Sequence, residues 1–473
     1  MDYSHGVVYT PQNVTQQRVV ADVTVLDDPS ISYVRIYWVD LVNIRRCRIV
    51  PIEYFKALLK SNRPGVNIAK VCFGLIYLMV APGFLPIGEY LYTVDVATLR
   101  PCPFAPGHVA VLGQFEEKAA IKGADGNTTV AVNLCPRTLL RRIVEQIKHS
   151  HKTEFLVGFE TEFILLKSTD PVEPVNIHDW TASAGLPAGS TETIVLQEIA
   201  DAITASGIAL SMYHPEAAPG QYEIVTGPLT PLEAADALVH TREIVVQVAA
   251  KNGLHATFAP RPFMYSAGSS AHAHISVHAQ GDQKPADKLS AHESSFLAGV
   301  LAHLPAIVAF TLPTSASYKR MTDGVWSGGT YVSYGTENRE APVRLTNATS
   351  PASRNFEARF VDGTANPHVA LAAVLAGGLL GLRAKLPLEM GDCTANSAAG
   401  MTEAERKALG ITQRMPLGVD EARQSLEKDA ALCEVLGSDF VEKYLSVNKT
   451  LEAALIQDGE NEAQQLTRLV KFY

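Results

Sequence analysis

Two glutamates separated by one residue stand inside an apolar, strand-like run of the sequence, GFETEFILL. Because side chains alternate between the two faces of a β-strand, Glu160 and Glu162 are predicted to share one face. Two carboxylates held that close repel each other unless a cation or a proton lies between them, so the pair favours a divalent-metal site. From this motif alone, an exposed strand face with two solvated acids is an equal alternative.

Three other segments carry polar pairs of the same kind. A turn separates the two acids of HPEAAPGQYE, and the pairs in GSSAHAHIS and FEARF alternate along predicted strands, so each pair could face a common point. A lone His-x-His pair is more often buried by packing than used as a ligand, but four pairs on separate strands favour one shared site. Glutamate oxygens with an occasional imidazole suit Mg²⁺ or Mn²⁺ better than Zn²⁺. These pairs are Glu216 and Glu223, His272 and His274, and Glu357 and Arg359.

Basic residues are concentrated in the segment between 319 and 359. In a chain with a net acidic charge, guanidinium groups gathered in this way suit the recognition of phosphate and carboxylate. Solvated surface charge is the alternative, and it fits Arg354 better than Arg359, which alternates with an acid inside a predicted strand. The other basic residues of the segment are Lys319, Arg320, Arg339 and Arg344.

The overall composition excludes several classes of protein. Of the 473 residues, 47% are hydrophobic and 19% are charged, which is typical of a globular chain. The formal net charge of −9 lacks the basic field that draws in nucleic acid or an anionic membrane. The six cysteines are widely spaced without a CxxC pair, which argues against a zinc cluster or a redox dithiol and predicts reduced thiols in a cytoplasmic protein.

Neither the N-terminal segment nor any internal run predicts membrane attachment. The first residues lack the basic and apolar regions of a secretory signal. The apolar window 71–87 is broken by glycine and proline, and the window 369–382 is too short to span about 30 Å of hydrocarbon. We therefore expect small molecules as partners, with no nucleic acid and no membrane.

The elements that must position these residues fall into two predicted domains. Residues 1–115 are predicted to form a small sheet domain, with a hairpin over 33–50 and further strands at 90–96 and 109–115. The larger domain, 116–473, opens with an amphipathic helix over 134–147 that places Arg137 and its basic neighbours on the wet face.

Strands and helices are mixed in the larger domain without the regular alternation of a parallel doubly wound sheet, so the predicted fold class is α+β. The candidate polar pairs lie on its predicted strands. Helices are predicted over 193–205, 231–251, 289–310, 367–382 and 419–456.

Taken together and in order, these motifs resemble those of the glutamine synthetase family. The similarity runs from about Tyr33 to the C-terminal helix, which makes it far more specific than a match to one motif. The resemblance implies a small N-terminal β-grasp-like domain and a large catalytic domain with a curved antiparallel sheet and flanking helices. The matching segments are GFETEF, HPEAAPGQYE, GSSAHAH, SYKR, NREAPVR, EARF and ANPHVALAAVLAGGLLGL.

The same resemblance implies an ATP-dependent ligation at a two-metal site. ATP phosphorylates the γ-carboxylate of glutamate, and an amine then displaces phosphate. It also implies a homo-oligomer of stacked rings, a decamer or a dodecamer, because the family's N-terminal sheet closes a neighbour's active site. The implied roles are one ion on Glu162, Glu216 and Glu223, a second on Glu160, His272 and Glu357, nucleotide contacts from His274, Arg339 and Arg344, and glutamate contacts from Arg320, Arg359 and Gly268.

The sequence departs from the ammonium-using enzymes of the family at several positions. Trp326 stands where they have a flap glutamate, and Phe73-Gly74-Leu75 replaces a Phe-Asp-Gly run, so two acids near the ammonium are missing. Ala267 replaces a frequent Asn, and Ser270-Ala271 replaces Gly-Met. An indole suits a bulkier amine through a cation–π contact of about 0.5–2 kcal/mol.

These departures resemble the FluG and lengsin-like branch of the family. They favour a ligase that joins glutamate, or a close analogue, to an organic amine that contacts Trp326. Three alternatives remain at this point: a glutamine synthetase that uses ammonium, a non-catalytic structural or signalling protein, and a metal-dependent hydrolase of the phosphatase kind.

Overall fold

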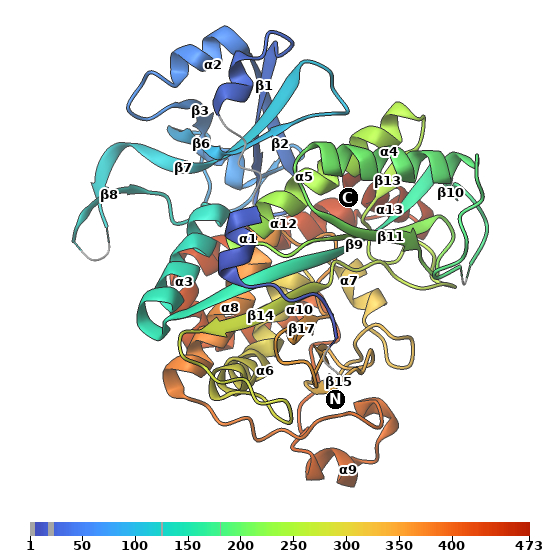
Figure 1. Cartoon of the computed structure of the whole chain (residues 1–473). Coiled ribbons are helices and arrows are strands. Elements are labelled where there is room, and N and C mark those ends of the chain that lie inside the picture. The colour runs from blue at the N-terminus through green and yellow to red at the C-terminus, as the bar shows by residue number, and fades with distance from the viewer. Residues whose placement is uncertain (1–4, 18–22, 124–125, 180) are drawn as a thin grey trace.

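Two separate β-sheets organise the chain (Figure 1). The computed structural model describes residues 5–17, 23–123, 126–179 and 181–473. A six-stranded sheet is formed by the N-terminal part, and a nine-stranded sheet lies in the larger part, with helices around both. This mixture of mainly antiparallel strands and helices confirms the predicted α+β class.

The N-terminal sheet begins with the predicted hairpin. Its strands β1 (Tyr33–Val39) and β2 (Arg45–Pro51) pair antiparallel. Asp40 fixes the turn between them, because its carboxylate accepts from the backbone N–H groups of Val42 and Ile44 at 3.1 and 2.9 Å. The sheet order is β2-β1-β7-β6-β3, with β8 paired to β7, and the added strands are β3 (Gly65–Ala69), β6 (Glu89–Pro101), β7 (His108–Lys122) and β8 (Thr128–Ala131).

This sheet continues beyond residue 115 in sequence. Strand β7 runs on to Lys122, and β8 pairs with it. The division of the chain into domains at residue 115 stays a prediction. Two short strands, β4 (Leu75–Ile76) and β5 (Met79–Val80), form a separate pair.

The nine-stranded sheet is built around one long strand, β9 (Thr153–Thr169). Its neighbours β12 and β14 run antiparallel to it, and β17 follows β14. The order along the sheet is β11-β12-β9-β14-β17-β16-β15, with β10 and β13 also paired to β9. The remaining bounds are β10 (Val172–Pro174), β11 (Leu210–Pro215), β12 (Gln221–Thr226), β13 (His255–Thr257), β14 (Ala273–Ala279), β15 (Tyr334–Thr336), β16 (Val343–Thr346) and β17 (Asn355–Ala358).

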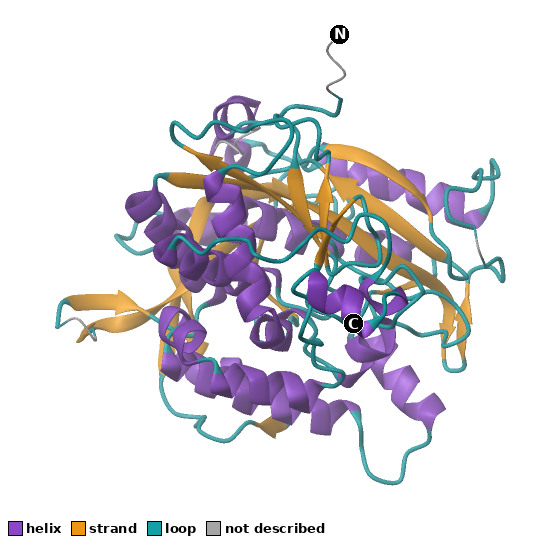
Figure 2. Cartoon of the chain, turned by 90° about the horizontal axis from the view of Figure 1, so that it is seen from below, coloured by secondary structure: helices purple, strands orange, loops and turns teal. Residues whose placement is uncertain are grey.

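Helices gather along this sheet, as the view from below shows (Figure 2). Their starts follow the sequence signals: α5 begins at Pro231, and α6 begins after Ser290, which exchanges hydrogen bonds with Glu293 in a capping box. The helices are α1 (Pro11–Gln17), α2 (Ile52–Leu58), α3 (Pro136–His151), α4 (Thr191–Ala205), α5 (Pro231–Lys251), α6 (Ala291–Thr311), α7 (Ser315–Arg320), α8 (Pro367–Ala384), α9 (Glu403–Ala408), α10 (Val419–Lys428), α11 (Ala430–Leu436), α12 (Ser438–Leu455) and α13 (Glu462–Phe472).

The helix predicted over 419–456 is divided into α10, α11 and α12, with breaks at Asp429 and at Gly437, whose φ is +100°. Helices α6 and α8 are long and apolar enough to cross a membrane by length and composition alone. However, 78% and 83% of their apolar windows are buried inside the fold, as in core helices.

The prediction that Arg137 faces solvent is wrong, because the structure buries this side chain in a network of charged groups. Arg137 donates to both oxygens of Asp236 at 2.9 Å, to Asp95 at 3.0 Å and to the carbonyl of Gly113 at 2.9 Å. His368 Nε2 lies 2.8 Å from the same Asp236. The network therefore ties the N-terminal sheet to α3, α5 and α8.

Replacing Arg137 with alanine is expected to lower the free energy of unfolding by about 3–5 kcal/mol, because Asp236 is then left buried without its countercharge. Urea unfolding of the full chain at neutral pH measures this. Arg141→Ala is the matched control, since Arg141 lies on the same helix and donates to the neutral side chain of Gln114. An equal loss in both variants would show that the buried charge pair adds nothing.

The pH dependence of this difference follows from Asp236. Burial opposes ionisation, but the charge of Arg137 and the hydrogen bond from His368 lower the pKa of Asp236 from 3.8 to about 2. A lowered folded pKa gives stability that is present above the unfolded value and is lost as the pH falls towards the folded one. The stability gap between the parent chain and Arg137→Ala should therefore shrink between pH 3.8 and about 2.

Candidate active site

Four neighbouring strands of the large sheet direct polar side chains to one place. Glu160 and Glu162 lie on β9, Glu223 on β12, His274 on β14 and Glu357 on β17. The strand register sets Glu223 opposite Glu162 and His274 opposite Glu357. Residues opposite each other in a sheet share a face, so the pairs predicted from period-2 alternation meet here.

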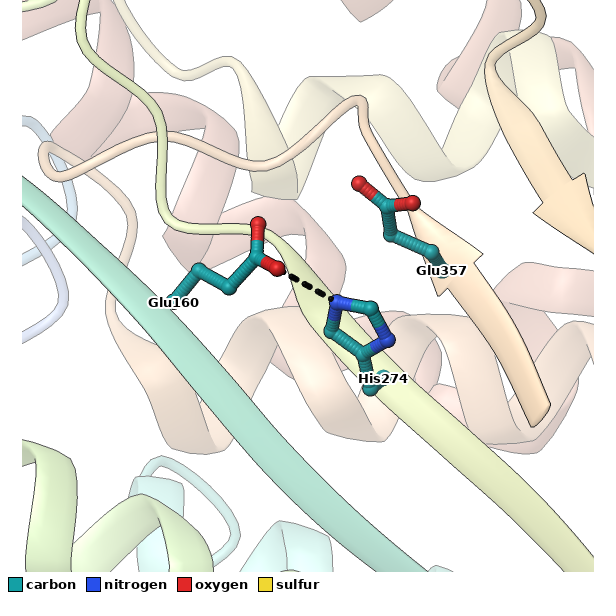
Figure 3. Close-up of side chains that lie close together, drawn as sticks. All are labelled: Glu160, His274 and Glu357. Atoms are coloured by element: carbon teal, nitrogen blue, oxygen red, sulfur yellow. Dashed lines mark hydrogen bonds and ion pairs between the residues drawn. The ribbon is translucent and has the colours of Figure 1, made fainter. Parts of the chain in front are cut away.

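The first cluster contains Glu160, His274 and Glu357, whose ligand atoms all lie within 4.8 Å of one another. Figure 3 shows the His274 ring below the carboxylates of Glu160 and Glu357, with a dashed line to Glu160, whose Oε1 lies 3.0 Å from His274 Nε2. His272, just before β14, also reaches this cluster, because its Nδ1 lies 2.9 Å from Glu160 and 3.4 Å from Glu357. The structure thus places both imidazoles against Glu160, and the assignment of His272 as the ligand and His274 to the nucleotide stays a prediction.

The second cluster contains His214, Glu216 and Glu223, from the β11–β12 hairpin. His214 Nε2 lies 3.2 Å from Glu223, and its Nδ1 lies 3.6 Å from Glu216. His214 was missed in the sequence, although its place two residues before Glu216 on a predicted strand is the same alternation that marked the other pairs. Glu162, which the resemblance adds to this set, lies opposite Glu223 in the strand register.

Glu162 is held by neutral donors from the start of β12 and from the loop before β14. It accepts from the backbone N–H of Ser270 at 3.0 Å and from the hydroxyl of Ser270. Gln221 Nε2 donates to Glu162 at 3.0 Å and to the carbonyl of Gly268 at 2.9 Å. The serine that departs from the family's usual glycine therefore orients an acid of the site.

Burial and the neighbouring imidazoles shift the pKa values of these acids in opposite directions. Burial, together with the other glutamates, raises the pKa of Glu223 to about 8, and burial also raises the pKa of Glu162 and Glu216. Although burial opposes it, hydrogen bonds from both imidazoles hold the pKa of Glu160 well below its usual value. Buried acids that repel one another favour a bound cation.

The donor set fits a divalent metal of the Mg²⁺ or Mn²⁺ kind. Carboxylate oxygens dominate, and imidazoles complete each cluster. The Nε2 atom of His272 is buried, and among the described residues no hydrogen-bonding group pairs with it. The other nitrogen of the ring, Nδ1, is the one that faces Glu160 and Glu357, so Nε2 is the buried imidazole nitrogen that a metal ion could take as a ligand.

Arg320 is packed tightly against Gly268 beside these acids. Its guanidinium is buried and donates to the carbonyls of Arg359 and Val361 at 3.0 and 3.4 Å. A Cβ atom on Gly268 would lie 2.5 Å from Arg320 Cγ and 2.7 Å from the carbonyl of Pro260, so only glycine fits. Gly268 therefore brings its backbone close to both Arg320 and Gln221.

Arg359 and Arg344 both contact Glu357 of the first cluster. Arg344 lies 3.2 Å from one carboxylate oxygen, and Arg359 pairs with the other. Arg359 also donates to the carbonyl of Arg339 at 3.1 Å and to the carbonyl of Trp326 at 2.7 Å. Cations therefore adjoin the acids, which is the environment that a polyanion bound through metal ions requires.

The structure places Arg339 and Trp326 on loops beside Arg359. The Arg339 side chain is exposed, and its carbonyl rather than its guanidinium meets Arg359. The Trp326 side chain is 62% exposed, and its backbone has a φ of +56°. Phe73 begins the Phe-Gly-Leu run that replaces the family's Phe-Asp-Gly run, and its side chain is buried in the core of the N-terminal sheet.

The model of the family described as "Glutamine synthetase, catalytic domain" matches residues 133–465, which is well over half of the chain. This chain belongs to the glutamine synthetase family. The match confirms the resemblance drawn from the ordered motifs. The family consists of carbon–nitrogen ligases that use ATP and a divalent metal.

Curated relatives support this membership. Protein fluG of Emericella nidulans is 35% identical over 435 residues, covering 89% of this chain and 47% of fluG, so the chain spans about half of that relative. The glutamine synthetase of Methanocaldococcus jannaschii is 31% identical over 445 residues, covering 89% of this chain and 91% of the relative. The gamma-glutamylpolyamine synthetase GlnA3 of Streptomyces coelicolor is 33% identical over 330 residues, covering 66% and 68%.

Solved structures of glutamine synthetase-like proteins share the fold. A crystal structure described as a novel glutamine synthase homolog superposes with a TM-score of 0.75 at 28% identity, covering 94% of this chain and 99% of that one. Ligand-free GmaS superposes with a TM-score of 0.78 at 23% identity, covering 94% and 98%, which speaks for the fold alone. The small sheet and the large catalytic domain are those of a glutamine synthetase-type fold.

Proposed function

We propose that this chain is an ATP- and divalent-metal-dependent ligase that forms a γ-glutamyl amide from glutamate, or a close analogue, and an organic amine. The observation that carries the proposal is the combination of two carboxylate–imidazole clusters with the Arg344–Glu357–Arg359 contacts, next to Trp326. These contacts supply the acids and guanidinium groups that phosphoryl transfer to glutamate would use, whereas the acceptor side presents an indole where the ammonium-using enzymes have a carboxylate.

The two clusters would hold two ions. We assign one ion to Glu162, Glu216 and Glu223, with His214 beside it, and the other to Glu160, Glu357 and the imidazole of His272, with His274 towards the nucleotide. Bound there, the ions offset the charge of the transferred phosphoryl group. Arg339 and Arg344 are assigned to the phosphates of ATP, and Arg320 with Arg359 to glutamate.

The proposed reaction has two steps. A γ-carboxylate oxygen of glutamate attacks the γ-phosphorus of ATP, the bond to the β,γ-bridging oxygen breaks, and ADP leaves from a γ-glutamyl phosphate. The lone pair of the amine then attacks the acyl carbon, the carbon–oxygen bond to phosphate breaks, and the proton lost from nitrogen is taken up by the departing phosphate, which leaves as hydrogen phosphate. Arg359 is assigned to hold the reacting carboxylate, and Trp326, on the neighbouring loop, to exclude water from the acyl phosphate.

The named relatives support an amine acceptor. GlnA3 of Streptomyces coelicolor is called a gamma-glutamylpolyamine synthetase, and 33% of its aligned residues are shared with this chain.

We further propose a homo-oligomer of stacked rings, a decamer or a dodecamer, in the cytoplasm, with the N-terminal sheet closing a neighbour's site.

The test is phosphate release from ATP with Mg²⁺ and glutamate, across ammonium and a panel of aliphatic, aromatic and polyamine acceptors, with products read by mass spectrometry. A γ-glutamyl amide from one amine class, and little product from ammonium, supports the proposal. Equal or greater activity with ammonium than with every amine contradicts it. No product from any acceptor, with ATP still bound, points to another acid substrate or a non-catalytic protein.

An ammonium-using glutamine synthetase is the second candidate, favoured by the 31% identity to the Methanocaldococcus jannaschii enzyme over 91% of its length. The two candidates differ at Trp326. Trp326→Glu is expected to raise the ratio of kcat/KM for ammonium to that for the preferred amine by about 10-fold or more, since a carboxylate favours a small cation and removes the indole contact. Trp326→Phe is the control and should keep the parent's preference. An unchanged ratio in Trp326→Glu would show that this side chain does not contact the acceptor.

A further inference from the structure

The loop that carries Trp326 is closed on itself by hydrogen bonds. Ser327 Oγ accepts from the backbone N–H of Thr322 at 3.1 Å and donates to its carbonyl at 2.8 Å. Gly324 and Trp326 both have positive φ, +79° and +56°. Left-handed residues in a short loop turn successive backbone N–H groups towards the same side, which makes a concave binding site for an anion.

The anion in this concave loop is the carboxylate of Glu340. It accepts from the N–H of Gly324 at 2.9 Å through Oε2 and from the N–H of Trp326 through Oε1. Glu340 starts from a fixed turn, because its own N–H donates to Asn338 Oδ1 at 2.9 Å. A Cβ atom on Gly329 would lie 2.6 Å from the carbonyl of Glu340, so the loop and the turn are packed directly against each other.

The carbonyl group of Trp326 is held by a residue of the active site. Arg359 donates to the Trp326 carbonyl at 2.7 Å and pairs with Glu357 of the first cluster. Two side chains therefore bind the Trp326 backbone: Glu340 accepts from its N–H, and Arg359 donates to its carbonyl. The start of the loop has a separate anchor, because Asp323 accepts from Thr330 at 2.8 Å and pairs with Arg414 at 3.1 Å.

We propose that Glu340 is a positioning residue that fixes the Trp326 loop beside the acyl-acceptor site and so sets the affinity for the acceptor. Loss of its carboxylate releases the N–H groups of Gly324 and Trp326, while Asp323 keeps the base of the loop attached and the contact of Arg359 with the Trp326 carbonyl remains. The part of this inference that concerns the acceptor rests on the proposed function, whereas the part that concerns the loop does not.

The chemistry of the carboxylate predicts graded variants. An ionised carboxylate accepts both N–H bonds, and each is stronger than a bond between neutral groups. Glu340→Gln keeps one acceptor oxygen but turns an NH₂ donor towards the second N–H, so half of the contact is lost. Glu340→Ala loses both bonds. Glu403→Gln is the matched control, because Glu403 is an exposed acid on α9 that pairs with Lys407 on the same helix.

The first readout is kinetic and uses the full chain. Glu340→Ala is expected to raise KM for the acceptor by about 10-fold, with kcat and the KM for ATP changed less than about 3-fold, since the loop contacts the acceptor and not the nucleotide. Glu340→Gln should fall between Glu340→Ala and the parent. The acceptor used is whichever one the parent turns over best, ammonium included.

The second readout is the mobility of Trp326 and needs no activity. The chain has three tryptophans, so the fluorescence of Trp326→Phe in each background is subtracted to isolate Trp326. Acrylamide is expected to quench the Trp326 signal about twice as strongly in Glu340→Ala as in the parent, because local order is lost. Glu403→Gln should leave the quenching unchanged.

The two readouts separate the possible failures. Unchanged quenching in Glu340→Ala overturns the inference, and so does raised quenching with an unchanged acceptor KM. Raised quenching together with a raised acceptor KM supports it. If the parent turns over no acceptor at all, the proposed function fails, and quenching alone decides whether Glu340 holds the loop.

Discussion

Glu160→Gln is expected to lower ATP-dependent phosphate release by about 10³-fold. The two carboxylate oxygens of Glu160 lie 3.0 Å from His274 and 2.9 Å from His272, so this side chain joins both imidazoles of the first cluster. Glutamine keeps the volume but carries no charge. A metal ion contributes several kcal/mol to transition-state stabilisation, and each 1.36 kcal/mol is about tenfold in rate.

The measurement combines phosphate release with Mn²⁺ binding by electron paramagnetic resonance. Glu154→Gln is the matched control, because Glu154 lies on the same strand and pairs with Lys148 away from the cluster. The control should keep both activity and Mn²⁺ binding. A folded Glu160→Gln variant that still turns over ATP at the parent's rate would show that the metal site has been assigned to the wrong residues.

The parts of the site that could be predicted from sequence are those set by local periodicity. Alternation along β9 and around β14 places Glu160 with Glu162 and His272 with His274 whatever the surrounding fold, because the side-chain period of a strand is fixed. Helix α5 was predicted with the bounds that the structure shows, since Pro231 starts it and no breaker interrupts its apolar pattern.

The parts that could not be predicted depend on contacts between distant segments. The pattern of α3 assigned Arg137 to solvent, but Asp236 and Asp95 come from other elements and bury it. Glu340 lies in the NREAPVR motif, in which the arginines were the candidate site residues. Only the folded loop shows that its carboxylate faces Gly324 and Trp326. Amphipathic patterns record average polarity and carry no information about a buried partner elsewhere in the chain.

Arg359→Lys is expected to lower phosphoryl transfer by about 10²–10³-fold, although the positive charge is retained. Arg359 uses three different nitrogens to reach Glu357, the carbonyl of Arg339 and the carbonyl of Trp326. A planar guanidinium holds three such partners in one fixed geometry. The ammonium of lysine is a compact charge on a flexible stem, so it cannot bridge the metal cluster and the Trp326 loop at once.

Comparing single-turnover formation of ADP with steady-state amide synthesis tests this account, because Arg359 joins the metal cluster to the acceptor loop. We expect both rates to fall in Arg359→Lys. We also expect acrylamide to quench the Trp326 fluorescence more strongly than in the parent, as in Glu340→Ala. Arg383→Lys is the control, since Arg383 is exposed near the end of α8. A variant that loses amide synthesis but forms ADP at the parent's rate would restrict Arg359 to the acceptor loop and remove it from phosphoryl transfer.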